Sequence, residues 1–186
     1  PSSGNAFMTY YTKPTKLEYY SKEGDNNGIW YGKLKNDITL SSKNVCHEEF
    51  VMLSQGLSPK GRKLLKVAPE NHRIGDDLTF SLIKSASVLF AGADQSTKQI
   101  IEKCHDDAVK TVLDYIQKNL IFVREQTEEK NKYKKVNADK CLIAKFNHYT
   151  SRLGDCNLHT HAILFNFAKN KQGKFKTIKT LSLIQN

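Results

Sequence analysis

The amino-acid sequence predicts one domain of the α+β class. Its 186 residues, 39% of them hydrophobic, are enough for a single compact core. Residues 141–149 form an apolar run typical of a buried strand, and 158–167 alternate as a strand does. The polar, glycine-containing segment between these strands predicts that they are antiparallel neighbours. Residues 96–118 instead place apolar side chains at helical spacing, which predicts a long helix.

Shorter segments predict the remaining elements. The pattern indicates a short helix over 43–57 that stops at Gly56, a basic loop over 58–62, and strands over 78–82 and 121–123. Residues 85–90 either begin a helix or stay extended. The charged segment 125–135 is expected to be a solvated loop or hairpin.

The charge balance favours an anionic partner. The chain has 29 Lys and Arg against 19 Asp and Glu, a net charge of +10, which suits nucleic acid or a membrane surface. No apolar run approaches the ~18 residues of a membrane span and no signal peptide opens the chain, so we expect a cytoplasmic protein without membrane insertion. The four cysteines form no C-x-x-C pair and are expected to be reduced thiols.

Three histidines form a candidate metal site. His159 and His161 are one residue apart on a predicted strand, so both rings project from the same face with Cα atoms about 6.5–7 Å apart. His148 ends the preceding strand, and a hairpin would bring it beside the pair. Three imidazoles with open coordination positions are typical of a catalytic metal site. The alternative is a chance H-x-H pair with His148 as a polar strand end.

Four tyrosines near the N-terminus are candidate nucleophiles toward a metal-activated phosphate. Tyr10, Tyr11, Tyr19 and Tyr20 form two doublets. A phenol has a pKa of about 10, so attack at neutral pH requires a base or a nearby cation. Alternatively these residues are strand or interface aromatics, and water is the nucleophile.

Asp77, at the head of the strand over 78–82, is the candidate supporting acid. It could hydrogen-bond a ligand histidine and so fix its tautomer, or assist removal of the tyrosine proton. The alternative is a solvent-exposed acid like its neighbour Asp76.

Three blocks of sequence together resemble a known family. The tyrosine doublets are followed by GDDLTFSLIKSAS at 75–87, FNHYTSR at 146–152 and LHTH at 158–161. This ordered set resembles the TraI/TrwC-type (MobF) conjugative relaxases over nearly the whole chain. The last block contains the histidine-hydrophobe-histidine signature of HUH endonucleases, here with Thr160 between the histidines. Two departures are Ile83, where the family usually has proline, and Asp76, where it often has arginine.

The resemblance implies a fold and a reaction. The fold would be a central, mainly antiparallel, palm-like sheet flanked by helices, with 1–186 as a relaxase catalytic domain truncated before a DNA-covering segment and any helicase domain. The reaction would be site- and strand-specific nicking and rejoining of DNA through a 5′-phosphotyrosyl intermediate, initiating conjugative transfer. Other classes left open are a water-using metal nuclease and a non-catalytic single-stranded DNA-binding module.

The resemblance also implies residue roles. It makes His148, His159 and His161 the metal ligands, Asp77 the supporting acid, Tyr10 the principal nucleophile and Tyr19 that of a second strand transfer, with Tyr11 and Tyr20 auxiliary. The candidate DNA contacts come from the chain's positive charge and aromatic residues instead: they are Lys84, Arg152, Arg62 and Trp30, the last by base stacking.

The expected cofactor is a divalent metal ion, with Mg²⁺ or Mn²⁺ favoured and Zn²⁺, Co²⁺ or Ni²⁺ also suited to imidazoles. The expected partners are single-stranded DNA at an origin of transfer and other proteins of the relaxosome and conjugation machinery. The expected location is the bacterial cytoplasm, with transfer of the protein covalently bound to DNA.

Overall fold

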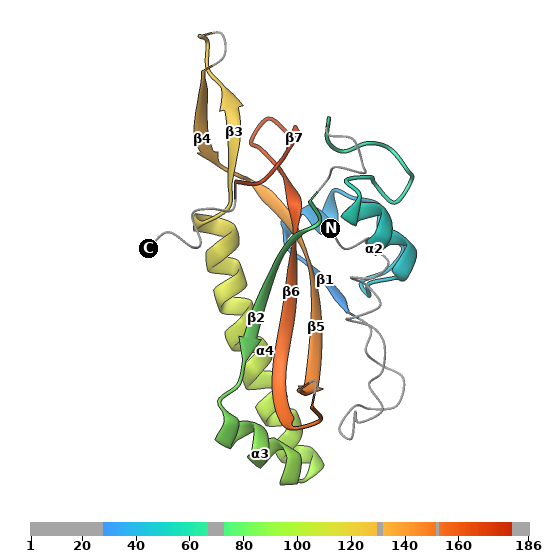
Figure 1. Cartoon of the computed structure of the whole chain (residues 1–186), viewed down its shortest axis with the longest axis vertical. Helices are drawn as coiled ribbons and strands as arrows, with labels where there is room; N and C mark the ends of the chain where they lie inside the picture. Colours follow the sequence, from blue (N-terminus) through green and yellow to red (C-terminus); the bar gives the residue numbers. More distant parts are fainter. Residues whose placement is uncertain (1–27, 67–72, 130–131, 152, 180–186) are drawn as a thin grey trace.

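A computed structural model describes residues 28–66, 73–129, 132–151 and 153–179. They form a five-stranded antiparallel sheet, a separate two-stranded hairpin and helices (Figure 1). The elements are β1 (Ile29–Tyr31), the 3-10 helix η1 (Lys33–Asn36), α2 (His47–Ser54), β2 (Gly75–Ser81), α3 (Lys84–Gly92), α4 (Gln95–Asn119), β3 (Phe122–Gln126), β4 (Tyr133–Asn137), β5 (Lys140–Thr150), β6 (Cys156–Lys169) and β7 (Phe175–Lys176). The predicted α+β class is confirmed.

The centre of the sheet is the hairpin of β5 and β6, its two longest strands. The strand order is β1-β5-β6-β2, with β7 paired to β6, and each pairing is antiparallel. This confirms the predicted antiparallel neighbours. Both strands extend one or two residues beyond the predicted segments at each end.

Apolar side chains of this hairpin are buried on both faces of the sheet. On one face Phe146 meets Phe50 of α2, with ring centroids 6.1 Å apart. On the other face Ile143 belongs to the same buried cluster as Leu113 of α4. Burial on both faces explains why β5 is a nearly continuous apolar run. Each such side chain contributes roughly 1.5–3 kcal/mol to folding.

Helix α4 spans almost the predicted range, but its buried stripe differs from the predicted one. Ile100 and Val112, two of the apolar residues whose helical spacing predicted the buried face, are 63% and 43% exposed. The buried stripe instead contains His105 and Gln117 beside its apolar members. Hydrophobic spacing alone could not separate these faces, because the sheet offers polar groups that bind the two polar side chains.

Trp30 does not offer a base-stacking surface, so that prediction is wrong. Trp30 is 1% exposed, and the centroid of its ring lies 6.0 Å from that of Phe165. The cause is the pairing of β1 with β5, in which Trp30 is opposite Ala144 and points into the core. Tyr31, on the opposite face, donates its hydroxyl to Asp114 of α4, and burial raises the pKa of this phenol.

The structure also decides the segments that the sequence left open. Residues 85–90 lie in helix α3, and the charged segment 125–135 belongs largely to the β3–β4 hairpin. Helix α2 is shorter than predicted, and Gly56 beyond it has a positive φ of 73°. The four cysteines are free thiols, as expected. Among the described residues, no helix has the length and apolar character needed to cross a membrane.

Candidate metal centre

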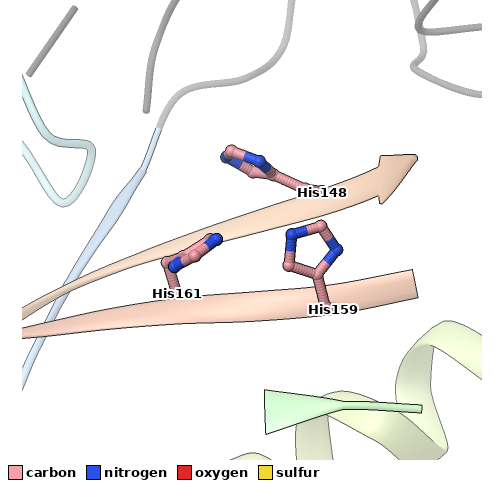
Figure 2. Close-up of side chains that lie close together, drawn as sticks. All are labelled: His148, His159 and His161. Atoms are coloured by element: carbon pink, nitrogen blue, oxygen red, sulfur yellow. The ribbon is translucent and has the colours of Figure 1, made fainter. Parts of the chain in front are cut away.

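The β5–β6 hairpin brings the three predicted histidines together. His148 is directly opposite His159 in the antiparallel register, and His161 follows two residues later on the same face. Figure 2 shows the three side chains side by side, one from β5 and two from β6. Their ring centroids are 5.2, 5.2 and 5.0 Å apart, a nearly equilateral triangle. The ring planes meet at 61–73°, so the rings surround a common space rather than stack.

These rings fit one metal ion. One ring nitrogen from each histidine lies within 4.8 Å of the others. Three nitrogens that bind one ion at about 2.1 Å lie about 3.0–3.6 Å from one another, so the rings have to converge by up to about 1–2 Å, a change that rotation of the side chains supplies. Three imidazoles leave further coordination positions for water or a phosphate oxygen, as in catalytic sites.

Asp77 of β2 lies against His161, because β2 pairs with β6. The Nδ1 atom of His161 is 2.8 Å and 3.1 Å from the two carboxylate oxygens. Thr79 Oγ1 lies 3.3 Å from the same nitrogen. A carboxylate accepts hydrogen bonds, so the proton of His161 is on Nδ1, and Nε2 carries the lone pair with which an imidazole binds a cation. The role of Asp77 in a reaction stays a prediction.

His159 is oriented by the backbone. Its Nδ1 donates to the Asn157 carbonyl at 2.9 Å, which again leaves Nε2 as the ligand atom. Burial lowers the pKa of His159 below that of a free imidazole, and neighbouring His161 acts in the same direction. A neutral ring is the form that binds metal.

The structure describes only some of the other predicted site residues. Lys84, the first residue of α3, is exposed and donates from Nζ to the Cys156 carbonyl at 3.1 Å, next to the hairpin turn. Arg62 is exposed in the loop after α2. Outside the described residues lie Tyr10, Tyr11, Tyr19, Tyr20 and Arg152.

Sequence reasoning missed a set of polar residues behind the histidines. Asn147 and Thr160 point to the opposite face of the hairpin, where His105 of α4 meets Thr160. Their signal was present, since both are polar residues directly beside the histidines on the predicted strands, and strand alternation directs them to the opposite face.

The fold and the site together place this protein in a class: α+β proteins with an antiparallel sheet and a metal site of three imidazoles on one hairpin. The family model of the TrwC relaxase matches residues 4–186. The chain therefore belongs to the TrwC relaxase family, which confirms the resemblance found in its motifs.

Named relatives agree with this assignment. The chain is 32% identical over 182 residues to the multifunctional conjugation protein TraI of Escherichia coli K12, a match that covers 96% of this chain and 10% of TraI. Its structure is similar to the conjugative relaxase TrwC bound to oriT DNA in a metal-bound form, with TM-score 0.72 and 28% identity over 91% of this chain and 58% of that one. A copper-bound TrwC–oriT complex gives TM-score 0.75 and 31% identity over 96% and 59%. The chain thus spans a tenth of TraI and under three fifths of the solved TrwC chains.

Proposed function

We propose that this protein nicks and rejoins one DNA strand at an origin of transfer, as the first step of conjugative DNA transfer. The observation that carries the proposal is the triangle of His148, His159 and His161 with Asp77 against one of its members. Family membership supports the same conclusion, since TrwC is seen with oriT DNA in metal-bound and copper-bound structures.

The chain's own residues prepare the site for a divalent ion. His159 and His161 hold their protons on Nδ1, through the Asn157 carbonyl and the Asp77 carboxylate, and so direct both Nε2 atoms outward. Bound there, the ion would polarise the scissile phosphate and offset charge on its non-bridging oxygens. Mg²⁺ and Mn²⁺ are the proposed ions, and the all-imidazole set also suits Zn²⁺, Co²⁺ and Ni²⁺.

Tyr10 is the proposed nucleophile. Its phenol loses a proton and its oxygen attacks phosphorus, while the bond from phosphorus to the 3′ oxygen breaks and that oxygen takes up a proton. The products are a 5′-phosphotyrosyl link and a free 3′-OH, and attack by a 3′-OH reverses the step without ATP. Tyr19 is proposed for a second strand transfer, with Tyr11 and Tyr20 in auxiliary roles.

The remaining features of the function follow from charge and family. Residues 1–186 are proposed to form the catalytic domain, with Lys84, Arg62 and Arg152 contacting the DNA backbone under the net charge of +10. The reaction would take place in the bacterial cytoplasm, with other relaxosome proteins as partners, and the protein would travel attached to the 5′ end of the transferred strand.

One experiment separates this function from its two rivals. The protein is incubated with labelled single-stranded DNA containing its origin sequence and with Mg²⁺ or Mn²⁺, and the products are run on a denaturing gel. The proposal predicts a protein–DNA adduct that survives denaturation and is lost in Tyr10→Phe. Cleavage without an adduct would indicate a water-using nuclease, and binding without cleavage a non-catalytic module.

The matched variants assign the nucleophile. Tyr19→Phe should retain the first adduct, whereas His159→Ala should lose it together with cleavage. An adduct that persists undiminished in Tyr10→Phe would show that another tyrosine reacts.

A further inference from the structure

A polar cluster lies directly behind the three histidines, on the opposite face of the β5–β6 hairpin. Successive strand residues point to opposite faces. Asn147 precedes His148, and Thr160 lies between His159 and His161, so both point away from the histidine side. They are cross-strand partners in the register of the hairpin. The cluster therefore occupies the strand positions adjacent to each histidine.

A chain of hydrogen bonds connects this cluster to α4. Thr160 Oγ1 donates to Asn147 Oδ1 at 2.8 Å, and the amide of Asn147 donates to Asp106 Oδ1 at 3.0 Å. Lys145 Nζ donates to the same Asp106 oxygen at 2.9 Å. His105 Nε2 is 2.9 Å from Thr160 Oγ1. Since the single hydroxyl proton of Thr160 is directed to Asn147, His105 is the donor in this contact.

The residue that follows His148 is also held by α4. Tyr149, the next residue on β5, donates its hydroxyl to Glu102 of α4. Its ring also stacks on Phe90 of α3, with centroids 5.6 Å apart and planes at 10°. Glu102, His105 and Asp106 are three and four residues apart, so they share one face of α4.

Burial makes this arrangement hard to rearrange. Thr160 is fully buried and His105 is 6% exposed. A buried donor or acceptor that loses its partner destabilises the structure by about 1–3 kcal/mol, so shifting either strand relative to α4 is strongly disfavoured. The histidine rings on the front face move with these strands, because their Cα atoms belong to the same backbone.

We propose that α4 positions the metal centre through the sheet, with His105, Thr160 and Asn147 as positioning residues that hold in place the two strands from which the three histidines converge on one ion. The proposal rests on the metal site of the proposed function and adds residues that point to the opposite face of the sheet from the three histidines. Thr160 and His105 act through the strands, not on the reacting atoms.

The test is the affinity of the protein for Co²⁺, measured by calorimetry and by the visible absorption of the bound ion, without DNA. Thr160→Val keeps the side-chain shape but removes the hydroxyl, and His105→Leu removes the donor. Each should raise the dissociation constant about tenfold, the lower end of the range for residues that orient metal ligands, and should change the Co²⁺ spectrum. Thr160→Ser keeps the hydroxyl and His105→Gln keeps a hydrogen-bond donor, so both variants should bind Co²⁺ nearly as the wild type does.

Gln117→Leu is the matched control. Gln117 is also 6% exposed on α4 and accepts a hydrogen bond from the Lys33 amide, but it lies three helical turns from His105. This variant should lower thermal stability while leaving Co²⁺ affinity and spectrum unchanged. Unchanged Co²⁺ binding in folded Thr160→Val and His105→Leu would overturn the proposal, and so would a wild type that binds no Co²⁺. Because no DNA is present, this test measures metal binding alone. Its outcome therefore does not depend on whether the protein nicks DNA.

Discussion

At the residue scale, Asp77 has the most specific contact in the site. Both of its oxygens lie within hydrogen-bond reach of His161 Nδ1, whereas the adjacent Asp76 pairs with Arg73 at 2.7 Å. The two neighbouring acids therefore differ in what they touch. The motif alone suggested this difference, and the pairing of β2 with β6 explains it.

Asp77→Asn should weaken metal binding, because a neutral amide is a poorer acceptor for the Nδ1 proton of His161. The dissociation constant should rise about 10- to 100-fold, the range for residues that support metal ligands. Calorimetric titration with Mn²⁺ or Co²⁺ measures this effect. Asp76→Asn is the control and should bind metal as the wild type does; equal affinities of all three proteins would contradict the assignment.

Ile83 marks a residue-scale departure from the family pattern, and its backbone already suits the usual proline. Its φ is −60° and its ψ is 148°, at the N-cap of α3, and its side chain is largely exposed. Ile83→Pro should therefore stabilise the protein by roughly 0.4–1 kcal/mol by restricting the unfolded chain. Denaturant unfolding compares it with Ile83→Ala, which should show no gain. A loss of stability in the proline variant would mean that the native turn needs the amide proton.

At the element scale, the hairpin that carries the histidines was predictable, and the helix behind it was only partly so. Two strands with a polar turn define a local pairing, so His148 could be placed beside His159 from sequence alone. The face that α4 turns to the sheet depends on contacts with residues some fifty positions away, such as Thr160 with His105. Hydrophobic spacing does not contain that information, and so the polar cluster was missed.

Asp37 joins three elements at the far end of the same hairpin. It follows η1 and accepts hydrogen bonds from Lys140 of β5 and Lys169 of β6, which are themselves cross-strand partners. The hydrogen bond from Lys169, followed by that from Lys140, lowers the pKa of Asp37 below its usual 3.8. A partly exposed ion pair of this kind contributes roughly 0.2–1 kcal/mol.

The pH dependence of this contact has a definite sign. A carboxyl whose pKa is lower in the folded state stabilises the fold above its unfolded value and loses that effect as pH falls through the folded value. The melting temperature of the wild type should thus exceed that of Asp37→Asn at pH 6, and this difference in melting temperature should shrink below pH 3.8. Melting curves followed by circular dichroism between pH 6 and 3 test this. A gap that stays constant over that range would contradict it.

At the scale of the whole molecule, class and family were predictable, because the α+β pattern and the three motifs are local in sequence. The fate of Trp30 was not, since its burial depends on which residue of the short strand β1 faces the core. Composition gives the excess of positive charge, but it does not show where on the surface the exposed cations lie.

The net charge of +10 predicts salt-sensitive binding of single-stranded DNA. The logarithm of the association constant should fall linearly with the logarithm of salt concentration, by about 0.7 for each phosphate neutralised. Fluorescence anisotropy measures this slope, and Arg62→Ala should reduce it by about 0.7. Lys132→Ala, which removes a cation paired with Glu129, should leave it unchanged. An affinity that does not vary with salt would rule out a phosphate-tracking surface.

The proposed reaction requires that the three histidines hold one ion and that tyrosine attack depends on it. Its most direct test is the amount of protein–DNA adduct formed by chelator-treated protein as Mn²⁺ is added back. We expect no adduct without metal, a rise in adduct that saturates as one high-affinity site fills, and no adduct at any Mn²⁺ concentration in His159→Ala. Full adduct formation in the chelated wild type, or an unchanged titration in His159→Ala, would contradict it.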